Sequence, residues 1–241
     1  MSYIRPLHTV GRDDIAVAGG KGANLGELIR AALPVPAGFV LTTEAYRTYV
    51  QANQLTEQVL ELARNREPDA AADQIRVLLT EGMIPEGLRA EVTGAYQAMG
   101  RPPVAVRSSA TAEDLADASF AGQQDTYLNV RGEDALLSAV QRCWASLWTA
   151  RAIAYRARQG IDPSTVSLAV VVQEMVAADA AGVLFTANPT NGRRQEAVIA
   201  AAWGLGESVV SGTVNTDDLV VVKADGRICL LYTSPSPRDR S

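Results

Sequence analysis

The chain of 241 residues is poor in cysteine and histidine and has no long apolar run. It has two cysteines, Cys143 and Cys229, which are too few for a disulfide framework. Its single histidine, His8, has no Cys or carboxylate partner at metal-ligand spacing. No window reaches the roughly 18 apolar residues that a membrane span needs, and residues 1–14 lack the apolar run of a signal peptide. We therefore expect a cytoplasmic protein without a membrane partner.

Positive charge is also in deficit, because 22 Lys and Arg residues stand against 27 Asp and Glu, a net charge of −5. A net acidic chain is a poor general binder of nucleic acid or of anionic membranes. We therefore expect no nucleic-acid partner, and any bound anion must be held by a local group of Lys and Arg. Hydrophobic residues make up 47% of the chain, which is enough for a core in one large or two small lobes.

The spacing of apolar residues predicts a mixed α/β (α+β) protein. Helical spacing is found at 44–51, 55–100 and 133–159, and a glycine-rich loop leads into a helix within 15–30. Gly160 is placed to end the helix at 133–159. Short β-branched or apolar runs predict strands at 38–41, 103–107, 168–172, 182–186, 197–202 and 219–222. A helical front half therefore precedes a sheet-rich back half.

The last segment, CLLYTSPSPRDRS at 229–241, does not continue this pattern. It has two prolines, three serines and no apolar period after Tyr232. It is either a flexible native tail or foreign sequence joined where the native chain was cut. We exclude it from the predicted fold.

Gly19-Gly20-Lys21-Gly22 is the first candidate site. Glycines allow the backbone to approach a phosphate closely, free N–H groups at a helix start favour an anion, and Lys21 adds a point charge. The segment matches neither the Lys-Ser/Thr nucleotide loop nor the dinucleotide fingerprint. A tight turn with a solvated lysine is the alternative.

Arg107 is the second candidate, at the end of the strand expected at 103–107 and before two serines, Ser108 and Ser109. Its planar guanidinium suits bidentate contact with phosphate oxygens, and the two hydroxyls can assist. The alternative is a surface arginine in a serine-rich loop.

The segment Ser119 to Tyr127 is rich in small residues and suits a loop that closes over a ligand. Gly122 gives the loop freedom, and Gln123 and Thr126 offer neutral hydrogen bonds. An ordinary loop that enters a strand is the alternative.

Gln173-Glu174-Met175-Val176 directly follows a buried strand. Peptide groups at such a strand end can pair with the edge of adenine, and Met175 can pack on the purine face. The glycine-rich turn at 203–207 could line the path of the phosphates. The alternative for residues 173–176 is an ordinary strand end, and the alternative for 203–207 is a strand-to-helix turn.

The order and wording of these segments resemble one known family. GGKGANLGEL, VPAGFVLTTEAY, VAVRSSATAEDLADASFAGQQDTYLNV, VVQEMV, AGVLFTANP and AAWGLGESVVSGTVNTD follow one another. Together they resemble the amino-terminal nucleotide-binding domain of the phosphoenolpyruvate synthase and pyruvate phosphate dikinase family, over roughly Ile15 to Lys223. AGVLFTANP and GLGESVVSG are most similar to the rifampicin phosphotransferase and synthase-like branch.

The resemblance implies a two-lobed ATP-grasp-type fold with ATP between the lobes. It implies that the ATP β-phosphoryl group passes to a histidine on a separate swivelling domain, with release of AMP, and then to an acceptor such as pyruvate or rifampicin. Lys21 and Arg107 would hold the phosphates. The loop over the phosphates would contain Gly122, Gln123 and Thr126. The adenine side would be formed by Gln173, Glu174, Met175 and Val176.

The chain departs from the family in two respects. It has no histidine after His8 to accept the phosphoryl group, and the family's Mg²⁺ ligands are expected downstream of the strand at 219–222. We therefore expect residues 1–228 to form an incomplete, carboxy-terminally truncated nucleotide-binding domain and 229–241 to be a non-native or disordered tail. Such a chain could not complete a catalytic cycle without the phosphohistidine and acceptor-binding domains. A stand-alone nucleotide-binding regulatory module is the alternative.

Overall fold

The computed structural model of the chain describes residues 2–111 and 126–232. The chain divides into two compact units, Met1–Met175 and Val176–Ser241, so the domain expected at 1–228 is divided after Met175. Both units contain helices and antiparallel strands, which confirms the mixed α/β prediction. Within the described residues, no helix combines the length and apolar character that a membrane crossing requires.

The first unit is built on a five-stranded antiparallel sheet in the order β1-β2-β5-β3-β4. The bounds of the strands are β1 Ile4–Pro6, β2 Gly38–Leu41, β3 Val104–Ala110, β4 Thr126–Val130 and β5 Leu168–Glu174. Strand β5 lies at the centre because its apolar run, LAVVV, is buried from end to end. The strands expected at 38–41, 103–107 and 168–172 are thus confirmed, and β3 continues to Ala110, beyond the predicted end at residue 107.

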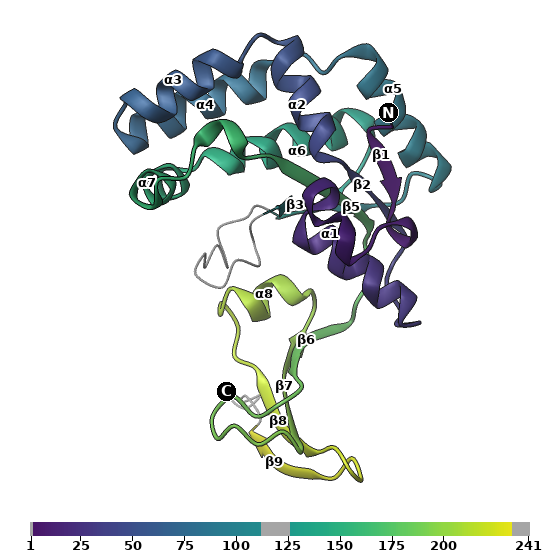
Figure 1. The fold of residues 1–241 in the computed structure, drawn as a ribbon. Coiled ribbons are helices and arrows are strands. Elements are labelled where there is room, and N and C mark those ends of the chain that lie inside the picture. Colours follow the sequence, from purple (N-terminus) through teal and green to yellow (C-terminus); the bar gives the residue numbers. More distant parts are fainter. Residues whose placement is uncertain (1, 112–125, 233–241) are drawn as a thin grey trace, which may run out of the picture. The chain divides into compact units, whose positions relative to one another are not determined.

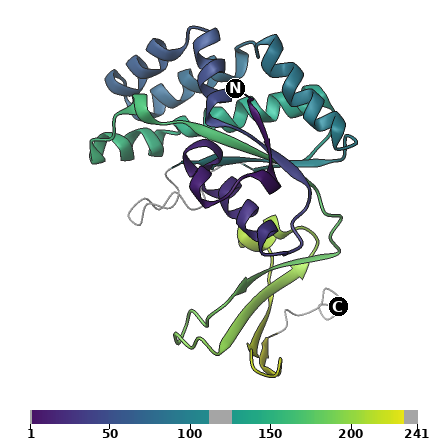
Figure 2. The ribbon, with the colours of Figure 1, turned by 45° about the vertical axis from the view of Figure 1, so that its right-hand side comes forward.

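Helices cover both faces of this sheet. Figures 1 and 2 show α1 on one side and the layer of α2 to α6 on the other. The helices are α1 Ile15–Arg30, α2 Thr43–Ala52, α3 Thr56–Asn65, α4 Pro68–Glu81, α5 Glu86–Ala98, α6 Glu133–Ala145 and α7 Ala150–Gln159, with 3₁₀ turns η1 Leu7–Thr9, η2 Arg12–Asp14, η3 Ser146–Trp148 and η4 Pro163–Thr165. The alternation of side chains along β5 serves two cores. Leu168, Val170 and Val172 join the large core under α2–α7, and Ala169 and Val171 join the smaller core under α1.

The expected single helix at 133–159 is wrong in one respect. Helix α6 ends at Ala145, the 3₁₀ turn η3 follows, and α7 begins at Ala150. Thr149 is extended (φ −65°, ψ 151°) and its hydroxyl oxygen accepts a hydrogen bond from the N–H of Ala152, so it caps α7. Gly160 ends α7 in the left-handed conformation (φ 64°), as the sequence predicts.

The second unit is a four-stranded antiparallel sheet in the order β6-β7-β8-β9 with one short helix. Its elements are β6 Ala180–Phe185, β7 Glu196–Trp203, α8 Gly206–Val210, β8 Asp217–Val222 and β9 Ile228–Tyr232. Strand β9 pairs with β8, so the sheet extends past the boundary expected at residue 228. The origin of residues 229–241 stays a prediction.

Candidate functional site

The glycine-rich segment forms a kink inside helix α1, where the sequence led us to expect a loop before a helix. Gly19 has non-helical angles (φ 68°, ψ 170°), and the helix resumes at Gly20. Lys21 therefore stands in the first turn of the resumed helix and is half-buried. The first N–H groups of a helix have no partner within it and carry the positive end of the helix dipole. The kink thus places the positive end of a helix dipole beside Lys21, within a segment whose residues Gly19, Gly20 and Gly22 are buried.

The kink is held against strand β3 by Ser109. The Ser109 hydroxyl donates to the carbonyl of Ala18 (2.9 Å) and accepts from the N–H of Gly22 (3.1 Å). Ser108 and Ser109 are both fully buried. The expectation that these two hydroxyls grip a phosphate therefore needs correction. Ser109 binds the backbone of α1, and neither side chain is exposed to a ligand in solution.

Arg107 lies on the face of the sheet that α1 covers. Along a strand, side chains alternate between faces, so Arg107 shares a face with Ser109, whose hydroxyl reaches α1. The register supports this, because Arg107 is opposite Val171, a member of the core under α1. Arg107 is half-buried. The structure therefore brings the strand of Arg107 and the helix of Lys21 together on one face, although 86 positions separate the two residues.

Thr126 is the member of the expected phosphate loop that lies within the described residues. It is the first residue of β4 and is directly opposite Arg107 in the register. Opposite residues of an antiparallel pair point to the same face with Cβ atoms about 4.5–5.5 Å apart. Thr126 thus lies beside Arg107 with an exposed side chain. Gly122 and Gln123 lie outside the described residues.

The end of β5 has less capacity for adenine than the sequence suggested. The N–H of Glu174 donates to the carbonyl of Ala37 (2.8 Å), and the N–H of Met175 donates to the carbonyl of Pro103 (2.9 Å). These two donors are engaged within the protein. A carbonyl oxygen has two lone pairs, so the carbonyls of this segment are the groups suited to accept from the adenine amino group.

The side chains at this strand end differ in their surroundings. Gln173 is buried, and its amide donates to the carbonyl of Pro36 (3.2 Å), which ties the strand to the loop before β2. Glu174 is exposed and Met175 is half-buried. Val176 is exposed and begins the second unit. Gln173 therefore acts as a tie within the first unit, and Met175 keeps the partial exposure that packing on a base would need.

Within the described residues the structure shows no cluster of metal-ligating side chains. Nowhere among them do three or more His, Cys, Asp or Glu side chains come together as metal ligands. Magnesium in kinases and ATPases is usually held by one or two carboxylates together with substrate phosphates and waters. We therefore derive no step of the chemistry through a metal held by these residues.

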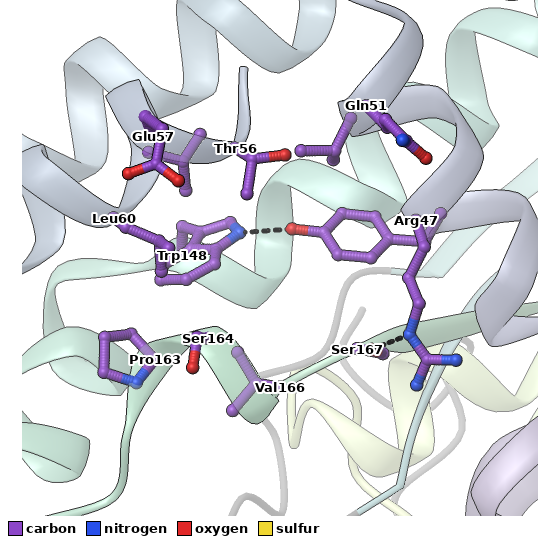
Figure 3. Close-up of a pocket in the computed structure, with 13 residues that line it drawn as sticks. Arg47, Gln51, Thr56, Glu57, Leu60, Trp148, Pro163, Ser164, Val166 and Ser167 are labelled. Carbon is purple, nitrogen blue, oxygen red and sulfur yellow. Dashed lines mark hydrogen bonds between the residues drawn. The ribbon is translucent and has the colours of Figure 1, made fainter. Parts of the chain in front are cut away.

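A separate cavity of about 480 Å³ opens on the other side of the sheet (Figure 3). It is lined by Tyr46 and Trp148, whose indole N–H donates to the Tyr46 hydroxyl (2.8 Å), together with apolar, polar and charged side chains from α2, α3 and the segment around η4. Burial raises the pKa of Tyr46 to about 12. Tyr46 and Trp148 belong to the core under α2–α7. This cavity contains none of the residues that the sequence nominated.

The turn at 203–207 connects β7 to α8, and its place along the path of the phosphates stays a prediction. The structure also identifies a residue that the sequence analysis interpreted differently. The Ser109 hydroxyl forms hydrogen bonds with the backbone of Ala18 and Gly22, which are far from it in the chain. No local sequence pattern identifies such distant partners.

Comparison with known proteins agrees with the resemblance. The family model for "Pyruvate phosphate dikinase, AMP/ATP-binding domain" matches residues 15–237. A probable phosphoenolpyruvate synthase of Methanocaldococcus jannaschii is 47% identical over 235 residues, 92% of this chain and 20% of that protein. Another from Methanothermobacter thermautotrophicus is 45% identical over 240 residues, 95% of this chain and 35% of that protein.

A rifampicin phosphotransferase of Streptomyces sviceus is 51% identical over 223 residues, which is 89% of this chain and 26% of that protein. The chain thus spans about a fifth to a third of the length of these relatives. The family model covers nearly the whole chain, including every described site residue. The chain therefore belongs to the family of the pyruvate phosphate dikinase AMP/ATP-binding domain.

Proposed function

We propose that this chain is the ATP-binding part of a phosphotransferase with an ATP-grasp-type arrangement. In this proposal the β-phosphoryl group of ATP passes to a histidine in another domain of the full-length protein, and AMP is released. The phosphohistidine then serves an acceptor such as pyruvate or rifampicin, which the names of the family model and of one relative suggest. We place the Mg²⁺ ligands outside the described residues and the protein in the cytoplasm.

One observation carries the proposal: Arg107 lies on the same sheet face as the helix that bears Lys21. Phosphoryl transfer depends mainly on positioning and on neutralising negative charge spread over the phosphate oxygens. A guanidinium, an ammonium and the start of a helix supply that charge within a chain of net charge −5. Thr126 beside Arg107 adds a hydroxyl at the same place. No described residue favours the stand-alone regulatory module.

Calorimetric titration of ATP into the 241-residue chain tests the two cations. Because a hydrogen bond to a charged group contributes about 1.5–3 kcal/mol, Lys21→Ala and Arg107→Ala should each weaken ATP binding by roughly 10- to 100-fold. Arg151→Ala is the matched control, since Arg151 is an exposed cation on α7, in the opposite layer. ATP affinity that is unchanged in both variants would remove the basis of the proposal.

A further inference from the structure

We infer that Ser109 is a positioning residue that fixes the lysine of helix α1 relative to the arginine of strand β3. The inference rests on the proposed function, because it concerns how Lys21 and Arg107 are held for the phosphates of ATP. It assigns a role to a side chain that is fully buried and would not itself touch the nucleotide.

The Ser109 hydroxyl spans the kink in α1. It donates to the carbonyl of Ala18, the residue before Gly19, and it accepts from the N–H of Gly22, the residue after Lys21. Lys21 therefore lies between the two points at which one side chain holds its helix. Arg107 lies two positions from Ser109 on the same strand and the same face. A covalent and hydrogen-bonded route between the elements of the two cations thus passes through this hydroxyl.

The backbone geometry at Gly19 depends on the same contact. A Cβ on Gly19 would lie 2.2 Å from the Ser109 carbonyl oxygen and 2.3 Å from its hydroxyl oxygen. Helix and strand therefore meet closely at Gly19, where the backbone and the hydroxyl of Ser109 fill the place that a side chain would take. Such close packing leaves little freedom for α1 to shift along β3 as long as the hydroxyl holds both sides of the kink.

The bonding capacity of the hydroxyl argues against direct phosphate contact. A serine hydroxyl has one hydrogen to donate, and Ser109 gives it to Ala18. A phosphate oxygen needs a donor, so Ser109 has none left for it. The effect of Ser109 on a bound triphosphate must therefore pass through the positions of Lys21 and Arg107.

Thr43, the first residue of α2, provides a matched control because its side chain also contacts the backbone of α1. Its hydroxyl donates to the carbonyl of Ala16 (3.0 Å), and the residue is buried like Ser109. The contact lies before the kink and involves α2, so it does not join Lys21 to β3. Loss of either hydroxyl removes a buried hydrogen bond to the backbone of α1, but only Ser109→Ala removes the link across the kink.

The experiment is a double-mutant cycle on the 241-residue chain, with ATP and adenosine as the titrants. We expect Ser109→Ala to weaken ATP binding roughly tenfold, the effect of losing one well-placed charged contact, with little change for adenosine. In the Lys21→Ala background the same substitution should have much less effect on ATP, because the residue that it positions is gone. Thr43→Ala should leave the affinity for both titrants unchanged.

Two results would overturn the inference while leaving the proposed function intact. One is a Ser109→Ala variant that binds ATP as the parent does while Lys21→Ala weakens binding. The other is a Ser109→Ala loss that is equally large with and without Lys21, or equally large for adenosine. If Lys21→Ala and Arg107→Ala both leave ATP affinity unchanged, the proposed function fails and the inference fails with it.

A second variant covers the case in which Ser109→Ala does not fold. Ser109→Cys keeps a side chain of similar shape with a weak S–H donor. It should give a smaller ATP-specific loss in the same direction, again absent in the Lys21→Ala background. A Ser109→Cys chain that loses affinity for ATP and for adenosine to the same extent would count against the positioning role.

Discussion

At the scale of single residues, Gly19 combines a positive φ with a close backbone neighbour. Its φ of 68° is strained for an L-amino acid, and a Cβ there would collide with the backbone of Ser109. Left-handed strain costs about 1–2 kcal/mol, and forced displacement of packed backbone adds about 1–3 kcal/mol. Gly19→Ala should therefore lower the melting temperature by at least about 4 °C, measured by calorimetry or circular dichroism.

Alanine substitutions at two other glycines distinguish backbone strain from collision as the cause of the lower melting temperature. Gly132 has a φ of 85° and an open surrounding, so Gly132→Ala should show the strain without the collision. Gly94 lies in helix α5, exposed and with nothing near its missing Cβ, so Gly94→Ala should stabilise the chain by about 0.5–1 kcal/mol. A Gly19→Ala chain no less stable than Gly132→Ala would show that the approach of Ser109 is not tight.

The candidate site residues show which features of the site can be predicted from neighbouring residues in the sequence. Lys21 and Arg107 were nominated from their neighbours in the chain, and the structure places their elements on one face. The role of the Ser109 hydroxyl escaped the sequence analysis, because a serine after an arginine looks the same whether it faces a ligand or a helix. The engaged N–H groups of Glu174 and Met175 escaped it for the same reason, since their acceptors Ala37 and Pro103 lie far away in sequence.

At the scale of elements, the break between α6 and α7 is a feature that apolar spacing conceals. The spacing of Trp144, Leu147 and Trp148 continues smoothly, yet η3 interrupts the helix. The guanidinium of Arg156 in α7 donates to the carbonyl of Leu147 and lies over the ring of Trp148, 5.1 Å from its centroid. Tertiary contacts therefore stabilise a turn that helix propensity alone would not form.

Thr149 should matter for stability because it caps the helix after this break. Its hydroxyl oxygen accepts from the N–H of Ala152 (3.3 Å), one of the unpaired groups at the start of α7. Thr149→Ala should cost about 1 kcal/mol in the free energy of unfolding, measured with urea. Thr93→Ala is the control with the opposite sign, because Thr93 sits inside α5 and alanine is the better helix former by up to about 0.7 kcal/mol.

Equal losses in the Thr149 and Thr93 variants would mean that the hydroxyl at position 149 does not act as a cap. Strands and helices could be predicted from the sequence, whereas the elements they pack against could not. A β-branched run such as Leu168 to Val172 marks a buried strand. Nothing in that run states that β5 lies between β2 and β3, which are 66 positions apart in their first residues, 38 and 104.

At the scale of the whole molecule, the two units differ in how much apolar surface they bury. In the first unit, β5 has buried side chains on both faces, with Val170, Val171 and Val172 fully covered. Among the described hydrophobic side chains of the second unit, Ala197 is the one that is buried, while Trp203 is 84% exposed. Local stability follows buried apolar contact, so the sheets should open at different free energies.

Amide hydrogen exchange followed by mass spectrometry can compare two strands matched in backbone bonding. Strand β5 pairs on both sides with β2 and β3, and β7 pairs on both sides with β6 and β8. Since their hydrogen-bonded ladders are alike, a difference in protection reports side-chain burial. After correction for intrinsic exchange rates, β7 should exchange at least about 100-fold faster than β5, which corresponds to roughly 2.7 kcal/mol in opening free energy. Equal protection of the two strands in the 241-residue chain would show that the second sheet is stabilised by something other than the burial seen in its own side chains.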